Sequence, residues 1–164
     1  MVTRITAGAF IFCGSKVLLM KRGLHKELGP GLWAGVGGHM ELGDIKNPRA
    51  LDLKATCLRE VYEETGICKA DIHNLKLRYI AIKRRSVKEM SFTYHFFGEM
   101  KMEAPLPKCD EGEFFWVDKE EILSLPMSRP VKEALRHWVQ NPKNDSVYMI
   151  AVNMEETSAE IAEI

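Results

Sequence analysis

The sequence has no excess of charge and no clustered cysteines, and each absence excludes a class of protein. Its 164 residues contain 23 Lys and Arg and 23 Asp and Glu, so the formal net charge is zero. A neutral chain offers no electrostatic basis for general binding to nucleic acids or membrane surfaces. The four cysteines, at positions 13, 57, 68 and 109, include no CxxC pair. They indicate reduced thiols in a cytoplasmic protein, rather than a disulfide framework or a zinc site.

Long hydrophobic segments are absent as well. None approaches the roughly 20 apolar residues of a membrane-spanning helix. The first 14 residues are apolar but alternating, and they lack a basic flank followed by a long apolar run, so we do not expect a signal peptide. With no repeat, low-complexity tract or linker, the length fits one domain that buries a sizeable core.

The most informative segment is acidic and has the spacing of a helix. Glu60, Glu63 and Glu64 stand at positions i, i+3 and i+4, so a helix places their side chains on one face. Three carboxylates this close repel one another, and a divalent cation between them removes the repulsion. Hard cations such as Mg²⁺ prefer oxygen ligands and bind phosphate groups together with carboxylates. Arg59 lies beside this face and can orient one glutamate through a bidentate bond.

The opposite face of the same segment is apolar and predicts packing against a β-sheet. Gly66 follows the last turn, where a left-handed cap favours a residue without a Cβ. Ile67 supplies the hydrophobic contact that accompanies such a cap. We therefore expect an amphipathic helix that ends at about Thr65. Its predicted apolar face consists of Leu51, Ala55, Leu58, Val61 and Tyr62.

The segment Arg-Glu-Val-Tyr-Glu-Glu-Thr-Gly-Ile, residues 59–67, resembles the second half of the Nudix box, the signature of the Nudix hydrolases. Residues 37–41, Gly-Gly-His-Met-Glu, resemble its first half. The family pattern is Gly, five residues, Glu, seven residues and then the second half. This chain departs from it twice, because Asp44 replaces the glutamate and 14 residues, 45–58, precede Arg59. The box therefore contains a seven-residue insertion.

The insertion has two readings. Asn47 followed by Pro48 is typical of a helix start, which predicts a helix over about 48–65. Alternatively, Asp52 caps a shorter helix and residues 45–51 form an extended loop. We favour the longer helix. The role of Asp44 stays open between holding a water molecule near the site and supporting the loop.

The resemblance implies an α/β fold, a Nudix-type α/β/α sandwich with a mixed β-sheet between helices. It covers about residues 3–140, and we expect a Nudix domain over residues 1–145. Residues 146–164 are expected to be a C-terminal strand and tail attached to the same domain. Strands are predicted at 3–13, 16–21, 74–84, 89–100, 114–117 and 146–154.

Two helical segments and the end of the chain are predicted from local signals. Asp118 with Glu121 resembles a capping box before a short helix. Ser128 opens a helix to about Gln140 that would cover the second sheet face. Residues 155–164 are acidic and predicted to be helical or frayed. The strand before them would extend the sheet or pair with a partner chain in a homodimer.

The resemblance also implies an activity and a set of site residues. It implies Mg²⁺-dependent hydrolysis, with Mn²⁺ as an alternative ion, of a nucleoside diphosphate linked to another moiety. The implied metal ligands are the carboxylates of Glu60, Glu63 and Glu64 and the carbonyl of Gly38, while Arg59 orients Glu60. The general base is left open between Glu60 and residues outside the box.

Other residues are candidates for the same site. The family often has a further glutamate outside the box, and Glu111 and Glu113 stand in a suitable acidic segment. Specificity is expected in loops 22–32, 84–89 and 102–113, but no side-chain pattern there identifies substrate-binding residues.

Three functions remain open at this stage. The first is a hydrolase of small nucleotides, acting either on nucleoside triphosphates as MutT does, or on a nucleotide sugar, ADP-ribose or a dinucleotide. The second is a non-catalytic nucleotide-binding or regulatory Nudix domain, against which the retention of all three glutamates argues. The third is a Nudix-fold isomerase of prenyl diphosphates, which would need a cysteine such as Cys57 in the pocket.

Overall fold

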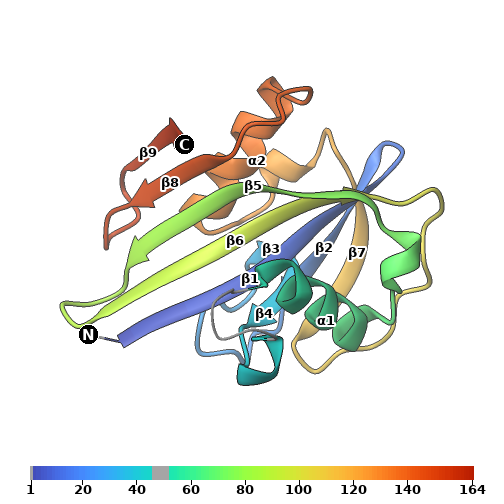
Figure 1. The fold of residues 1–164 in the computed structure, drawn as a ribbon, viewed down its shortest axis with the longest axis horizontal. Coiled ribbons are helices and arrows are strands. Elements are labelled where there is room, and N and C mark those ends of the chain that lie inside the picture. The colour runs from blue at the N-terminus through green and yellow to red at the C-terminus, as the bar shows by residue number, and fades with distance from the viewer. Residues whose placement is uncertain (1, 46–51) are drawn as a thin grey trace.

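A mixed β-sheet forms the centre of the molecule in the computed structural model, which describes residues 2–45 and 52–164 (Figure 1). The strands are β1 (Val2–Cys13), β2 (Lys16–Arg22), β3 (Trp33–Ala34), β4 (Val36–His39), β5 (His73–Arg84), β6 (Glu89–Glu99), β7 (Gly112–Asp118), β8 (Tyr148–Val152) and β9 (Ala159–Glu163). The main order is β3-β2-β1-β6-β5-β8-β9, while β4 pairs with β1 and β7 pairs with β2. The sheet is mixed because β1 runs parallel to β6, and β5 parallel to β8.

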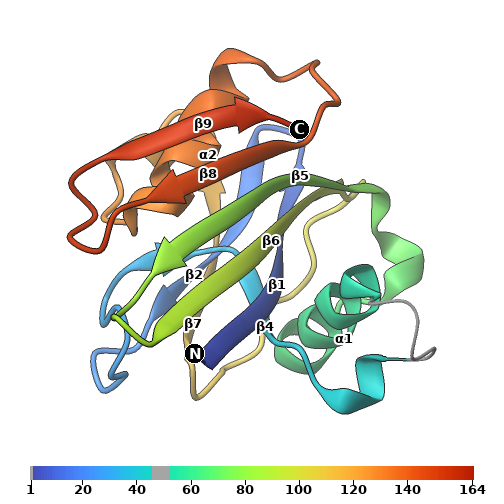
Figure 2. The ribbon, with the colours of Figure 1, turned by 60° about the vertical axis from the view of Figure 1, so that its left-hand side comes forward.

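One α-helix covers each face of this sheet, as Figures 1 and 2 show. These helices are α1 (Leu53–Thr65) and α2 (Arg129–Gln140), and short 3₁₀ helices occur as η1 (Leu42–Asp44), η2 (Lys69–Asp71) and η3 (Ile122–Ser124). This arrangement confirms the predicted α/β/α sandwich. Among the described residues, neither α-helix is long and apolar enough to cross a membrane.

The alternation of strand side chains divides the core into two layers. Along β1, Phe10 and Phe12 face α2, whereas Ala9 and Ile11 face α1. The α2 layer includes Val131, Ala134, Leu135 and the partly buried Trp138, as the helical spacing predicts. The α1 layer includes Ala7, Leu18, Met20, Val36, Cys57, Val61 and Phe96. Strand register therefore fixes which side of the molecule each helix occupies.

The start of α1 differs from the favoured prediction. The helix begins at Leu53, and the side chain of Asp52 accepts a hydrogen bond of 3.0 Å from the backbone N–H of Ala55. The longer helix is therefore wrong at this point, because Asp52 is not helical and its side chain caps the shorter helix at the N–H of Ala55. The proposed start at Asn47 and Pro48 lies outside the described residues.

The end of α1 confirms the predicted cap and corrects one side chain. Gly66 has φ +73°, and its N–H donates to the carbonyl of Tyr62 at 2.8 Å. Tyr62 was expected on the apolar face but is 58% exposed. The buried stripe instead includes Cys57, Val61 and Thr65. Leu51, also assigned to the apolar face, lies outside the described residues.

The second half of the chain confirms two predictions and corrects two. The predicted strand forms β8, which extends the sheet beside β5. The tail is not helical or frayed, because β9 pairs antiparallel with β8 in a hairpin. The capping box at Asp118 is also wrong, since this residue ends β7 and η3 is preceded by Glu121 without a side-chain cap. Helix α2 follows Ser128, as predicted.

Candidate functional site

The acidic face of α1 lies against the glycines of β4. Gly37 and Gly38 pair with Gly8 and Ala7 of β1, which brings the β4 backbone close to the helix. A Cβ on Gly38 would lie 2.4–2.6 Å from the carboxyl atoms of Glu60. Because glycine has no Cβ, the Glu60 carboxyl group can lie directly on the backbone of Gly38, and a larger residue there would require this carboxyl group to move. The fold thus brings together two residues that the sequence predicted to share a site.

Arg59 connects this face to the loop before the helix. Its Nε and Nη2 donate to the two carboxylate oxygens of Asp44 at 2.9 and 3.0 Å, and Nη2 also donates to the carbonyl of His39 at 2.9 Å. Its Nη1 lies 3.0 Å from Oε1 of Glu60 and 2.9 Å from Oε2 of Glu63. Arg59 therefore contacts two of the three box glutamates while a bidentate bond fixes its own position.

Asp44 is the buried end of this network. It is 6% exposed and accepts further hydrogen bonds from the Thr56 hydroxyl at 3.0 Å and the Glu41 N–H at 2.9 Å. The hydrogen bonds from Arg59 hold the pKa of this carboxyl group far below its ordinary value, although burial opposes the shift. All these contacts of Asp44 hold the loop before α1 in place and fix the position of Arg59. Sequence reasoning missed Thr56, whose only signal was a hydroxyl on the turn before Arg59.

Glu64 has the environment of a cation ligand. Its Oε2 atom is shielded from solvent and has no hydrogen-bond partner among the described residues. Burial, followed by the charges of Glu60 and Glu111, raises the pKa of Glu64 to about 7, while a backbone hydrogen bond from Gly37 opposes the shift. Burial likewise raises the pKa of Glu60. A buried carboxylate oxygen without a partner is costly, and a bound cation would remove that cost.

The chemistry of these donors fits a hard divalent cation. Carboxylate and carbonyl oxygens suit Mg²⁺ or Mn²⁺ better than softer ions. As the side chains stand, no three acidic, His or Cys side chains of residues 2–45 and 52–164 converge closely enough to hold an ion. The physical reason is that Glu60 and Glu63 both turn toward Nη1 of Arg59. Glu63, whose side chain is 54% exposed, is the more accessible of these two partners of Arg59.

The two glutamates considered outside the box lie in different places. Glu111 forms an ion pair with Lys26, and its charge acts on Glu64. Glu113 is exposed on β7, opposite Lys21 of β2. The structure therefore brings Glu111, but not Glu113, toward the box glutamates. Loop 22–32 also begins close to the box glutamates, because the charge of its first residue, Arg22, lowers the pKa of Glu64.

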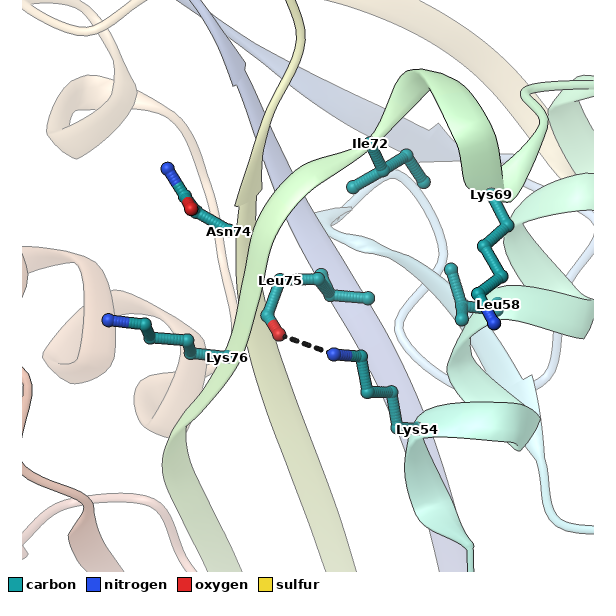
Figure 3. Close-up of a pocket in the computed structure, with 7 residues that line it drawn as sticks. All are labelled: Lys54, Leu58, Lys69, Ile72, Asn74, Leu75 and Lys76. Atoms are coloured by element: carbon teal, nitrogen blue, oxygen red, sulfur yellow. Dashed lines mark hydrogen bonds between the residues drawn. The ribbon is translucent and has the colours of Figure 1, made fainter.

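A groove of about 360 Å³ lies on another side of α1, between this helix and β5 (Figure 3). Lys54 in this groove donates to the carbonyl of Leu75 at 2.9 Å, as Figure 3 shows. Its lining consists of Lys54, Leu58, Lys69, Ile72, Asn74, Leu75 and Lys76. Because no carboxylate lines it, this groove is not the cation site.

Trp33 and Cys57 both pack in the core. Trp33 packs on the core layer under α2, with its ring centroid 5.1 Å from that of Phe115. Cys57 is fully buried under α1, and burial raises the pKa of its thiol to about 12. A thiol in this position does not face a substrate, so Cys57 cannot be the cysteine that the isomerase hypothesis needs.

Gly38 gives a direct test of the site. We expect Gly38→Ala to lower divalent-cation affinity by about 10- to 100-fold, because its Cβ displaces the Glu60 carboxyl group. Isothermal titration calorimetry of the purified protein with Mn²⁺ measures the change in affinity. The matched control is Gly43→Ala, since a Cβ at Gly43 meets no atom within 4 Å. Equal Mn²⁺ affinities of the two variants would contradict the placement of Glu60.

Comparison with known proteins identifies the family of this chain. A family model described as the NUDIX domain matches residues 2–139. A similar solved structure is the mutator MutT protein from Bacillus halodurans, which is 22% identical, with a TM-score of 0.73 over 96% of this chain and 97% of that chain.

Two further structures have the same fold. The MutT protein from Methanosarcina mazei Go1 is 23% identical, with a TM-score of 0.67 over 87% of this chain and 96% of that chain. The Nudix domain of Shewanella oneidensis NrtR, solved with ADP-ribose, is 20% identical, with a TM-score of 0.64 over 85% of this chain and 90% of that chain. Because the family model matches well over half of its length, this chain belongs to the Nudix family.

Proposed function

We propose that the protein hydrolyses the pyrophosphate bond of a nucleoside diphosphate linked to another moiety, with Mg²⁺ or Mn²⁺ as the cofactor. Membership of the Nudix family supports a hydrolase that acts on pyrophosphate bonds. The observation that supports this most strongly is the unpartnered, shielded Oε2 of Glu64 beside the Glu60 carboxyl group. Such an oxygen on an acidic helix face is what a site for a cation and phosphate needs.

Each residue of the site then has a role. Glu60, Glu63 and Glu64, with the carbonyl of Gly38, would hold the cation. A cation bound there supplies charge stabilisation for phosphoryl transfer and a more acidic water. Arg59 sets the positions of Glu60 and Glu63 before the cation binds. The general base stays open between Glu60 and a carboxylate outside the box, for which Glu111 is the candidate because its charge acts on Glu64.

The substrate class is proposed as a small nucleotide. Two related structures carry the name MutT, and the Nudix domain of NrtR was solved with ADP-ribose. These similarities support two candidates, a nucleoside triphosphate and an ADP-ribose-like diphosphate, which includes nucleotide sugars and dinucleotides. The products separate them, because a triphosphate releases pyrophosphate or phosphate, whereas ADP-ribose releases two monophosphates.

A substrate panel tests this proposal. We expect the wild-type protein to turn over one member of a panel of nucleoside triphosphates, nucleotide sugars, ADP-ribose and dinucleotides, and to need Mg²⁺ for it. Glu63→Gln should reduce that rate by roughly 10²- to 10³-fold, because one charged ligand is lost. Product analysis by ion-exchange chromatography gives the bond that is cleaved.

One outcome would favour the non-catalytic alternative. If no substrate is turned over while a nucleotide still raises the melting temperature, the site binds nucleotides without hydrolysing them. In that case the box, with its insertion after Asp44, serves binding rather than hydrolysis.

Three expectations from the sequence remain proposals. We propose that residues 1–145 are the Nudix domain and that 146–164 extend it. The four cysteines are free, in keeping with a cytoplasmic protein. The strand expected to pair with a partner chain, β8, already pairs with β5 and β9, so a homodimer would instead use the outer edge of β9. Sedimentation of the purified protein would detect it.

A further inference from the structure

A second groove lies where β1 and β6 end and β5 begins, and its volume is about 260 Å³. Two aromatic rings of the α2 core layer, those of Phe12 and Trp138, line it. Three cationic side chains line it as well, those of Lys76, Arg78 and Lys119. Because α1 and α2 cover opposite faces of the sheet, this groove lies across the sheet from the box glutamates (Figure 2).

A β-bulge places one of these cations. The register of β5 against β6 shifts between Leu77 and Tyr79, which makes Arg78 the extra residue of the bulge. A bulge changes the direction of a side chain and is often found beside a functional site. The Arg78 side chain is 6% exposed and lines the groove. The strand therefore departs from regular pairing at the residue that supplies a buried guanidinium to this groove.

The contacts of Arg78 do not compensate its charge. Its Nη1 lies 3.7 Å from the Asp145 carboxylate, which is beyond hydrogen-bond distance, and its Nε donates to the Ser146 carbonyl at 3.4 Å. The other oxygen of Asp145 is bonded to Nζ of Lys76 at 2.7 Å, and the Asp145 side chain is 67% exposed. A buried charge without a close counter-charge is costly, so an anion in the groove would stabilise Arg78.

Lys119 supplies a second cation that is available to an anion. Its Nζ lies 5.3 Å from the ring centroid of Phe12 and 5.7 Å from that of Trp138. Within residues 2–45 and 52–164, this ammonium contacts these rings rather than a carboxylate. A cation above aromatic rings keeps N–H donors free on its other side. Glu99, the second carboxylate of the groove, already accepts a hydrogen bond from the Asn74 amide at 3.3 Å.

We propose that this groove binds a small anion with a phosphate group, held by the guanidinium of Arg78 and the ammonium of Lys119. Three cations face two carboxylates there, so the net charge is positive. A guanidinium binds phosphate through two parallel hydrogen bonds. The groove is smaller than the roughly 300–1,000 Å³ of sites for drug-sized ligands, so it fits inorganic phosphate or a small phosphomonoester better than a nucleotide. This site goes beyond the proposed function and does not depend on it.

Substitutions in the groove should change phosphate affinity in opposite directions. We expect Arg78→Gln to weaken the binding of inorganic phosphate by about tenfold or more, and Lys119→Met by about threefold. Asp145→Asn should instead tighten it by about threefold, because a carboxylate that competes for Arg78 is removed. Arg85→Gln, which changes an exposed arginine just after β5, is the matched control and should bind as wild type does.

Isothermal titration calorimetry measures these affinities at constant ionic strength, with a chelator present. The chelator removes the divalent cations through which phosphate could bind beside α1. Tryptophan fluorescence locates the anion, because binding beside Lys119 changes the surroundings of the Trp138 ring. Trp138→Phe should lose this fluorescence change and keep the affinity. Titration with glycerol 3-phosphate distinguishes the two sources of the phosphate group, since tighter binding than that of inorganic phosphate assigns the site to a phosphomonoester and weaker binding assigns it to free phosphate.

A purely structural ion pair between Arg78 and Asp145 predicts a different result. Asp145→Asn would then lower the melting temperature and would not tighten phosphate binding. Lys119→Met and Asp145→Asn keep the test decisive if Arg78→Gln does not fold, because both change side chains outside the buried bulge. The proposal is wrong if wild type binds neither inorganic phosphate nor glycerol 3-phosphate, or if Lys119→Met and Arg85→Gln bind phosphate equally well.

Discussion

Glu64→Gln is expected to lower hydrolysis by roughly 10²- to 10⁴-fold while leaving the metal-free protein as stable as wild type or more stable. Activity falls because Gln lacks the negative charge that a cation needs at this position. Stability does not fall because the Glu64 carboxylate is partly buried, has an unpartnered oxygen and lies near the charges of Glu60 and Glu111. A substitution in a purely structural residue would instead lower stability and activity together.

The pH dependence of stability follows from the pKa of Glu64. Its folded-state pKa is raised to about 7, above the ordinary carboxyl value near 4.3. The folded state therefore binds the proton more tightly, so this group stabilises the metal-free protein as pH falls from about 8 to 5. Glu64→Gln should remove that dependence and gain about 1–2 kcal/mol at pH 8.

Chemical unfolding at pH 5 and pH 8 in the presence of a chelator measures this difference. Glu120→Gln, an exposed acidic residue just after β7, is the control and should match wild type at both pH values. With saturating Mg²⁺ this dependence should disappear between pH 8 and pH 5, because a bound cation keeps the Glu64 carboxylate ionised and the folded state no longer takes up the proton in this range. A Glu64→Gln variant that keeps wild-type activity would remove Glu64 from the proposed site.

Asp44→Asn is expected to destabilise the protein by about 2 kcal/mol and to lower activity by about 10- to 100-fold. Asn keeps the shape of Asp44, but its NH₂ group cannot accept a hydrogen bond from Arg59. The charge on Arg59, whose side chain is 23% exposed, then loses its bidentate partner. Glu60 and Glu63 lose their fixed positions as a consequence. In differential scanning calorimetry this corresponds to a melting temperature lower by about 4–8 °C.

Acid should have the same effect as this substitution on the wild-type protein. The Asp44 pKa is lowered in the folded state, so its contribution to stability is complete above the ordinary carboxyl value near 4 and is lost as pH falls below it. The difference in stability between wild type and Asp44→Asn should therefore be largest at neutral pH and shrink below about pH 4. Asp52→Asn keeps a capping side chain at the start of α1 and serves as the control. A difference that does not change with pH would show that Asp44 acts through its shape alone.

The sequence by itself determined the local elements of this protein. The spacing of Glu60, Glu63 and Glu64 predicted a helix with an acidic face, and Gly66 predicted where it ends. The sandwich fold was implied by the resemblance to the Nudix family and is confirmed. Alternating strands and the helix after Ser128 were predicted from local patterns and are also confirmed. These predictions succeeded because helical periodicity, strand alternation and caps depend on residues only a few positions apart.

Only the tertiary structure decided which side chains meet. Asp44 lies 15 residues from Arg59, and Lys26 lies 85 residues from Glu111, so neither pairing has a local signal. The exposure of Tyr62 and the extra strand β9 were predicted wrongly, because the packing of α1 on the sheet and the pairing with β8 decided them. Contacts of this kind depend on the register of a sheet whose strands come from distant parts of the chain, and that register is a property of the whole fold.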